Sequence, residues 1–166
     1  MNIIVKSDGT LIFNKKQYRC ALGKNGITAD KKEGDETTPI GCFSMRKLFY
    51  RPDRFEKVPQ TNLLVQALSK EDGWSNDVDS SEYNTFVKLP HNGSYEKLWR
   101  ADNLYDLIVP IGYNDNPVVS GKGSAIFMHI ARDGYIPTMG CVVLSRDDFL
   151  EILGVVDVDT KVCIQE

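Results

Sequence analysis

Histidine is scarce in this sequence, and close clusters of metal-binding residues are missing. The 166 residues include only two histidines, His91 and His129, and four cysteines with no Cys-x-x-Cys pair. No two of these side chains have the close spacing that zinc ligands show, so no metal is expected. No run of apolar residues approaches the length of a membrane-spanning segment, so no membrane span is expected either.

An excess of positive charge is also missing. Twenty lysines and arginines stand against 23 acidic residues, for a formal net charge of -3. With no basic stripe in the sequence, nucleic-acid binding is not expected. The sequence begins MNIIVKSDGT, which lacks the basic segment and apolar core of a signal peptide. We therefore expect a cytosolic protein, or one exported by an unrecognised route, with reduced cysteines.

Short apolar runs separated by turn residues dominate the chain. Asn2–Val5 and Thr10–Phe13 flank a Ser-Asp-Gly turn and predict a hairpin. Only Arg146–Leu153 has a clear helical pattern, with Ser145 as its N-cap and Gly154 just past its end. Strands and helices do not alternate regularly. The sequence predicts a mostly β fold with a small helical component, forming a single domain over residues 1–166.

Several further expectations can be compared directly with a structure. Cys42–Tyr50 alternates like one continuous strand, whereas Glu71–Lys88 is polar and predicts a long irregular loop. Glu96–Arg100 is expected to form a helical turn. The remaining expectation is that three of the four cysteines are core thiols, namely Cys20, Cys42 and Cys163.

The chemistry-bearing residues lie around one polar loop. An apolar run ends at His129, and a second run begins just after Gly140-Cys141. If the two runs form adjacent strands, the imidazole and the thiol can meet, which is the pairing that activates a cysteine nucleophile. Gly140 permits a close backbone approach, and nearby amides could face a carbonyl oxygen. The alternative is a buried cysteine that acts only as a small hydrophobic residue.

The segment from Thr138 to Leu144, with His129 before it, resembles the active-site signature of the L,D-transpeptidases, the YkuD/ErfK-type catalytic domain. That signature has a histidine, a spacer, then Ser/Thr-x-Gly-Cys and an apolar residue. Upstream, Gly23 and the run Thr37-Thr38-Pro39-Ile40-Gly41 resemble the family's G…T-P-x-G-x-F motif, which lies at the approach to the substrate groove. The resemblance covers nearly the whole chain.

Three positions depart from the usual signature. Met139 stands where many members have a histidine directly before Gly-Cys. Val143 stands where many have arginine or asparagine, and Ile130 where glycine often follows the first histidine. His129 is then the imidazole nearest to the cysteine in sequence. These departures bear on the substrate preference more than on the nucleophile.

The resemblance implies a β-sandwich-like domain that uses peptidoglycan stem peptides as both donor and acceptor. No cofactor is needed for this chemistry, and the protein is expected to be a monomer. Cys141 would attack the carbonyl of an L-centre followed by a D-residue, forming a thioester and releasing D-alanine. His129 would serve as base, oriented by a backbone carbonyl such as that of Ile130. The amides of Met139, Gly140 and Cys141 would form the oxyanion hole.

Two alternatives stay open at this stage. With water as acceptor, the same site would make an L,D-carboxypeptidase. Met139 and Val143 motivate a domain that binds wall peptides without turning them over. The substrate implies the periplasm or cell envelope, yet with no signal peptide in view a cytoplasmic location stays open.

Other residues are candidates for contacting the substrate. Arg132, in the loop between histidine and cysteine, could meet a substrate carboxylate or an aspartate of its own loop. Trp99 could line the substrate groove, or it could simply pack with its neighbours as part of the core. Tyr113 and Asn114 follow a strand, and they could either form a turn or contact the substrate. The full set of candidates is Tyr113, Asn114, Arg132, Trp99, His91 and Thr138.

Overall fold

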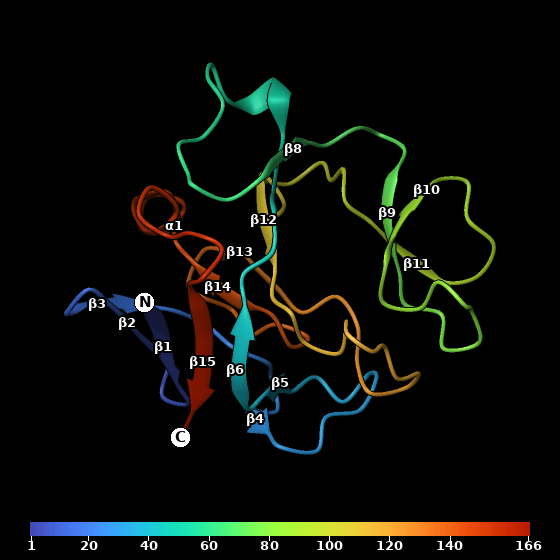
Figure 1. Ribbon diagram of the computed structural model, residues 1–166, viewed down its shortest axis with the longest axis horizontal. Coiled ribbons are helices and arrows are strands. Elements are labelled where there is room, and N and C mark those ends of the chain that lie inside the picture. The colour runs from blue at the N-terminus through green and yellow to red at the C-terminus, as the bar shows by residue number, and fades with distance from the viewer.

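The chain is built mainly of β-strands, as the computed structural model of residues 1–166 shows (Figure 1). Two five-stranded sheets share one apolar core, and a three-stranded sheet and a two-stranded sheet complete the fold. The mostly β prediction with a small helical component is confirmed. No helix has the length and apolar character needed to cross a membrane.

The first sheet contains both ends of the chain. Its strand order is β3-β2-β1-β15-β6, and β1 runs parallel to β15. Alternate residues such as Ile3, Val5 and Leu11 are fully buried, because one face of the sheet packs on the core. The strands are β1 (Asn2–Lys6), β2 (Thr10–Phe13), β3 (Lys16–Arg19), β6 (Gly41–Ser44) and β15 (Lys161–Gln165).

The second sheet has the order β14-β13-β12-β7-β8 and is buried on both faces at its centre. One face, with Met128 and Val109, packs against the core shared with the first sheet. The opposite face, with Phe127 and Ile108, forms a second apolar cluster. The strands are β7 (Leu48–Tyr50), β8 (Val65–Ala67), β12 (Leu107–Pro110), β13 (Phe127–Ile130) and β14 (Val142–Leu144).

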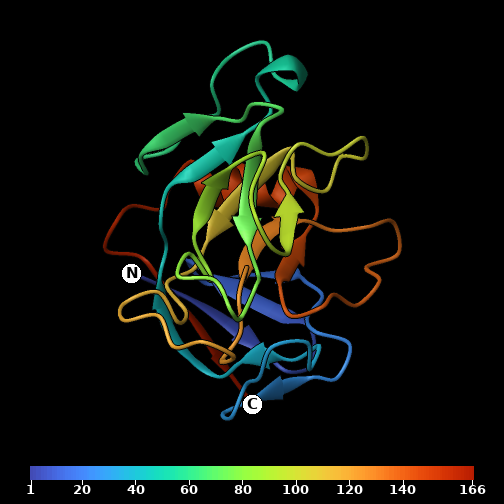
Figure 2. The same ribbon diagram turned by 90° about the vertical axis from the view of Figure 1, so that its right-hand side faces the viewer.

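A three-stranded sheet covers that second apolar cluster, and we call it the covering sheet. It comprises β9 (Asp72–Ser75), β10 (Phe86–Lys88) and β11 (Tyr95–Lys97), and it lies nearest the viewer in Figure 2. The ring of Trp74 contacts Phe127 edge-on, with centroids 5.0 Å apart. The expectations of an irregular loop over Glu71–Lys88 and a helical turn at Glu96 are therefore wrong. Packing of Trp74, rather than local strand propensity, stabilises this sheet.

The helix was predicted with its correct limits. α1 (Arg146–Leu153) begins after Ser145, whose hydroxyl accepts a hydrogen bond from the amide of Asp148 at 3.2 Å. Its buried residues Phe149, Ile152 and Leu153 join the shared core. A short 3-10 turn, η1 (Pro52–Arg54), and the parallel pair β4 (Ile27–Thr28) and β5 (Thr38–Pro39) complete the elements.

The expected strand over Cys42–Tyr50 is two strands in two different sheets. β6 belongs to the first sheet and β7 to the second. Between them, the amide of Met45 donates to Thr160 O and the amide of Arg46 donates to Pro110 O. The chain thus changes hydrogen-bonding partners as it crosses from one sheet to the other, which the alternating pattern alone does not reveal.

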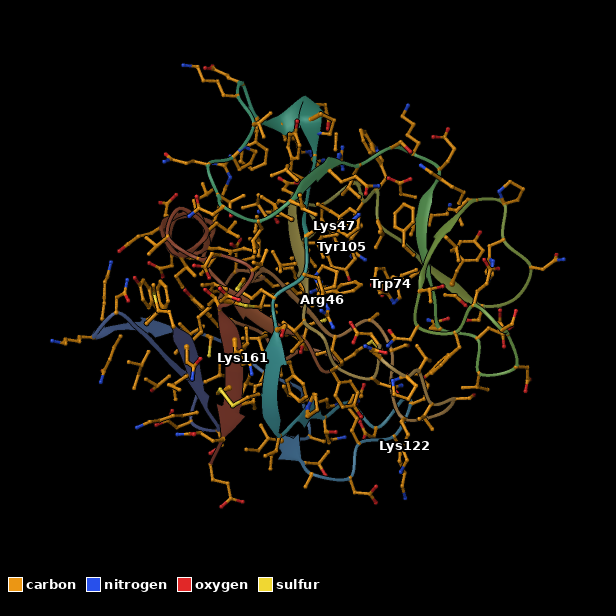
Figure 3. The ribbon with its side chains drawn as sticks, viewed as in Figure 1. Arg46, Lys47, Trp74, Tyr105, Lys122 and Lys161 are labelled. Carbon is orange, nitrogen blue, oxygen red and sulfur yellow. A yellow bond between two sulfur atoms is a disulfide. The ribbon has the colours of Figure 1, made fainter.

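Cys42 and Cys163 form a disulfide, so the expectation of reduced core thiols is wrong for this pair (Figure 3). The two residues are direct register partners on the antiparallel strands β6 and β15, with Cα atoms 3.9 Å apart. Cys42 is exposed, whereas Cys163 is buried. Since 121 residues separate them, only the sheet topology brings them together.

Removing this disulfide is expected to destabilise the protein substantially. Replacing both cysteines with serine should lower the free energy of unfolding by about 2–5 kcal/mol, because the cross-link restricts the unfolded chain over a long loop. Denaturant titration of the two proteins measures the difference. The control is a reductant, which should shift the wild-type midpoint and leave that of the double variant in place. Equal midpoints for both proteins without reductant would contradict the prediction.

Candidate active site

Cys141 and His129 lie on neighbouring parallel strands. His129 on β13 is the register partner of Val143 on β14, and Cys141 directly precedes β14. Partners in a sheet point to the same face, and so do residues two apart along a strand. Cys141 and His129 therefore share the face of the second sheet that turns toward the covering sheet. The expectation of two adjacent strands at this place is correct.

The thiol of Cys141 is held between two backbone groups. The Sγ atom accepts a hydrogen bond from the amide of Phe127 at 3.4 Å and donates one to the carbonyl of Ala125 at 3.3 Å. Burial raises the pKa of the Cys141 thiol to about 12, and the charge of Glu96 raises it too, against smaller opposing effects of the Phe127 amide and Lys31. The resting cysteine is therefore a protonated thiol at neutral pH.

His129 is fixed in one tautomer by its own strand. Its Nδ1 atom lies 2.9 Å from the carbonyl of Ile130, and a carbonyl only accepts, so Nδ1 carries the proton. The Nε2 atom makes no hydrogen bond within the chain and is free to accept a proton. The pKa of His129 is lowered to about 4, mainly by burial. The charge of Arg100 also lowers the pKa, whereas the backbone carbonyls of Ile130 and Leu104 raise it. The imidazole is thus neutral at physiological pH, as a general base must be.

The turn before the cysteine is held by two threonines. Thr138 Oγ1 donates to the carbonyl of Cys141 at 2.7 Å and accepts the amide of Gly140 at 3.1 Å. Thr38 Oγ1 accepts the amide of Gly23 and donates to the carbonyl of Gly140, both at 2.9 Å. The upstream segment and the cysteine turn, far apart in sequence, are therefore one hydrogen-bonded unit.

Gly140 is required by the geometry of this turn. Its φ of +139° lies in a region that side chains disfavour, and a Cβ there would be 2.8 Å from the carbonyl oxygen of Thr37. Because Thr138 occupies the Gly140 amide, that group is not free to bind an oxyanion. The amides of Met139 and Cys141 make no hydrogen bond in the structure and are the available donors.

A pocket of about 540 Å³ opens onto the thiol and the imidazole. Its walls come from the covering sheet, from the loop between β13 and β14, and from the upstream segment. Of the predicted site residues, it brings together Cys141, His129, Met139, Thr138 and Arg132. The charged groups that line it are Glu33, Glu96, Arg100 and Arg132.

Four other predicted substrate contacts lie outside this pocket. Trp99 stacks under the guanidinium of Arg51, whose carbon atom is 3.7 Å from the ring centroid. His91 lies 3.4 Å from a carboxylate oxygen of Glu82, and its ring packs edge-on against Tyr95. Asn114 ties its own loop together through Val119 and Gly123. A contact between these residues and substrate stays a prediction that their positions do not support.

Tyr113, the fourth of these residues, lines another pocket, of about 270 Å³. That pocket lies between β7, β12 and the covering sheet, and Phe127 and Trp74 are also part of its wall. Trp74 appears in Figure 3 between the covering sheet and β12.

Sequence reasoning did not identify Asn84 and Ala125, which position the thiol of Cys141. The Asn84 side-chain oxygen accepts the Ala125 amide and the Trp74 indole, both at 3.0 Å. Ala125 has a φ of +54°, an uncommon value for a residue with a side chain. Asn84 thereby anchors the covering sheet to the residue whose carbonyl receives the thiol. Nothing in the local sequence distinguishes Ala125, since its conformation depends on this distant partner.

Tyr105 and Glu96 were also missed as site residues. The Tyr105 ring packs edge-on against His129, with centroids 4.9 Å apart, and its hydroxyl donates to the Glu96 carboxylate. Tyr105 lies in the connection from β11 to β12, in an apolar stretch that predicts only a core strand. The spacing of these residues in sequence carries no sign of their meeting.

The raised pKa of Cys141 predicts slow alkylation at neutral pH. Iodoacetamide reacts with the thiolate, so the rate should rise about tenfold per pH unit between neutrality and the pKa. Quenched samples read by mass spectrometry give the rate, and unfolded protein, in which the thiol has an ordinary pKa, is the control. A rate that stays level from neutral to alkaline pH would indicate a preformed thiolate and contradict the prediction.

Comparison with known families identifies the class. The model of the L,D-transpeptidase catalytic domain, YkuD, matches residues 2–164. The chain therefore belongs to the L,D-transpeptidase catalytic domain family, as the motif around Cys141 predicted. This family consists of cell-wall enzymes that act on peptidoglycan peptides. No curated protein sequence matches the chain significantly.

Solved structures of L,D-transpeptidases resemble the chain at low identity. An L,D-transpeptidase from Mycobacterium smegmatis is 13% identical with a TM-score of 0.45. L,D-transpeptidase 1 and L,D-transpeptidase 3 from Mycobacterium tuberculosis, the latter with a faropenem-derived adduct, are each 15% identical, with TM-scores of 0.42 and 0.47. All three alignments cover 99% of this chain but 58%, 58% and 60% of the solved chains. The chain thus spans about three fifths of their length.

Proposed function

We propose that this protein is a cysteine L,D-transpeptidase that transfers peptidoglycan stem peptides through a thioester on Cys141. The observation that carries the proposal is the shared pocket of Cys141 and His129. In it, Nδ1 of the imidazole is bound to Ile130 O and Nε2 is left free. A thiol and an unprotonated imidazole nitrogen at one cavity wall are the parts that nucleophilic acyl transfer needs.

Acylation begins when the thiol turns from Ala125 O toward His129. Nε2 takes the thiol proton while Sγ attacks the carbonyl carbon of the donor peptide, forming the C–S bond. The free amides of Met139 and Cys141 would stabilise the negative oxygen that results. The C–N bond to D-alanine then breaks, and His129 returns the proton to the departing amine. This sequence needs no preformed thiolate, in keeping with the raised pKa of Cys141.

Deacylation reverses the roles with a new amine. The nitrogen of a second stem peptide attacks the thioester carbonyl, forming the C–N bond and breaking the C–S bond. His129 accepts a proton from that nitrogen and passes it to Sγ, which restores the thiol. Water in place of the amine would release a tripeptide instead.

Product analysis with a defined substrate tests this proposal. The purified protein is incubated with a disaccharide-tetrapeptide, and products are read by mass spectrometry. A cross-linked dimer together with released D-alanine is the expected result. Tripeptide without dimer would establish an L,D-carboxypeptidase. Binding of the tetrapeptide with no product would support the wall-peptide-binding alternative and contradict the proposed chemistry.

We propose that the protein acts in the periplasm or cell envelope. The disulfide between Cys42 and Cys163 supports this location, since such bonds persist mainly in oxidising compartments. The family's substrate supports it as well. Labelling of free thiols in protein taken directly from cells provides the test: two free cysteines would fit an oxidising compartment, and four would contradict the proposal.

A further inference from the structure

The Cys141 pocket contains a carboxylate in a position that disfavours thiolate formation. Glu96 on β11 is one of the pocket-lining residues, and its charge is among the main causes that raise the pKa of Cys141. A cysteine nucleophile gains nothing in its first step from a nearby negative charge. The Tyr105 hydroxyl donates a hydrogen bond to Glu96, and it could donate equally well to the amide oxygen of a neutral glutamine. The charge of Glu96 therefore calls for another explanation.

No cation of the chain forms an ion pair with this carboxylate. The charge of Arg100 lowers the pKa of Glu96, but Arg100 is itself paired with Asp102 through two hydrogen bonds of 2.8 and 2.6 Å. Glu33, which also lines the pocket, accepts a hydrogen bond from the Ser124 hydroxyl and forms no ion pair either. The pocket thus holds two carboxylates without cationic partners.

His129 adds a nitrogen acceptor to the same pocket. It lines the pocket, its Nδ1 atom is bound to Ile130 O, and its Nε2 atom forms no hydrogen bond with another group of the chain. A nitrogen acceptor and two carboxylates without ion pairs at one cavity suit a ligand that donates several hydrogen bonds and carries positive charge. A protonated primary amine has both properties.

We propose that Glu96, assisted by Glu33, binds the protonated amine of the acceptor peptide and takes its first proton before the amine attacks the Cys141 thioester. The inference rests on the proposed function and names the part of the site that selects the acceptor. An ammonium nitrogen has no lone pair, so one proton must leave before it can attack. Burial raises the pKa of Glu96 against the opposing effects of the Tyr105 hydroxyl and Arg100, and the charge of Glu33 adds a smaller increase, which makes Glu96 a better base for this transfer.

The proton balance of the second step is then complete. Glu96 receives one proton from the ammonium, and the neutral nitrogen forms the C–N bond as the C–S bond breaks. His129 receives a second proton from the same nitrogen and delivers it to Sγ. The amide product keeps the third hydrogen, and Glu96 releases its proton to water before the next cycle.

Glu96→Gln tests this assignment because glutamine still accepts the Tyr105 hydroxyl. The disaccharide-tetrapeptide serves as donor and acceptor, and hydroxylamine, largely uncharged at neutral pH, serves as a second nucleophile. Cross-linked dimer should fall about tenfold or more in the variant, because a charged hydrogen bond to the ammonium is lost. D-alanine release during acylation and tripeptide hydroxamate formation should not fall. Glu71→Gln, at an exposed glutamate directly before β9 and outside the pocket, is the matched control.

Three results would overturn the inference in distinguishable ways. Unchanged dimer formation in Glu96→Gln would show that the charge has no part in acceptor binding. A parallel loss of dimer, hydroxamate and D-alanine release would assign Glu96 to the structure of the pocket. If wild-type protein releases no D-alanine, then the proposed function itself fails, and the role of Glu96 fails with it.

Discussion

Cys141→Ala is expected to abolish D-alanine release from a disaccharide-tetrapeptide, lowering the rate by about a thousandfold or more. The variant lacks the only thiol in the pocket, so no thioester can form. The remaining pocket still binds the peptide, and alanine fits the space because the thiol makes only two weak hydrogen bonds. Intact-protein mass spectrometry of quenched reactions should show an acyl adduct on wild type and none on the variant.

The other free cysteine provides a control for this experiment. Cys20 is buried in the core shared by the two large sheets and lies outside the pocket. Burial raises its pKa to about 12, as it does for Cys141, so the two thiols differ in position and not in acidity. Cys20→Ala should keep the adduct. An adduct that persists in Cys141→Ala and disappears in Cys20→Ala would place the nucleophile elsewhere.

His129→Gln has the second largest expected effect. General base catalysis contributes about a hundredfold to ten-thousandfold, and glutamine cannot accept and return a proton. Its amide can still donate to Ile130 O, so the fold at neutral pH should persist. Single-turnover formation of the Cys141 adduct measures the loss, and the thermal unfolding midpoint at neutral pH controls for the fold. An adduct rate within about threefold of wild type would remove His129 from the mechanism.

The same variant should change how stability depends on pH. The pKa of His129 is about 4 in the folded protein and 6.5 ordinarily. Between these values the unfolded chain binds a proton that the folded chain does not, so stability falls as the pH drops from 6.5 toward 4. This amounts to about 3 kcal/mol over that range. Denaturant titrations of His129→Gln should show that much less acid sensitivity than wild type.

Local signals allowed the sequence to predict α1 and the strands around the candidate nucleophile. A capping serine, two aspartates in the first turn and a following glycine define Arg146–Leu153 within ten residues. The apolar runs at β13 and β14 are equally local. The carbonyl of Ile130 was expected beside His129, and the hydrogen bond is present. Each of these features depends on residues close together in the chain.

Features that depend on distant partners were missed. β9 reads Asp-Gly-Trp-Ser, which has little intrinsic strand propensity, and it forms because Trp74 packs on Phe127. The pairing of Cys42 with Cys163 follows from the position of β15 between β1 and β6. The contact of Tyr105 with His129 likewise requires the tertiary fold. No spacing rule along one sequence contains this information.

Because β13 and β14 pair in parallel, the relative position of His129 and Cys141 depends on the strand register and not on how many residues separate them in sequence. His129 is fixed by its register with Val143, whereas the connection over residues 131–137 is largely exposed. Lengthening that connection would leave the imidazole and thiol in place, because the ladder of backbone hydrogen bonds sets their separation. Inserting one residue between Phe127 and His129 would instead turn the imidazole to the opposite face. The strand register, and not the number of residues between histidine and cysteine, therefore sets how the imidazole and the thiol face each other.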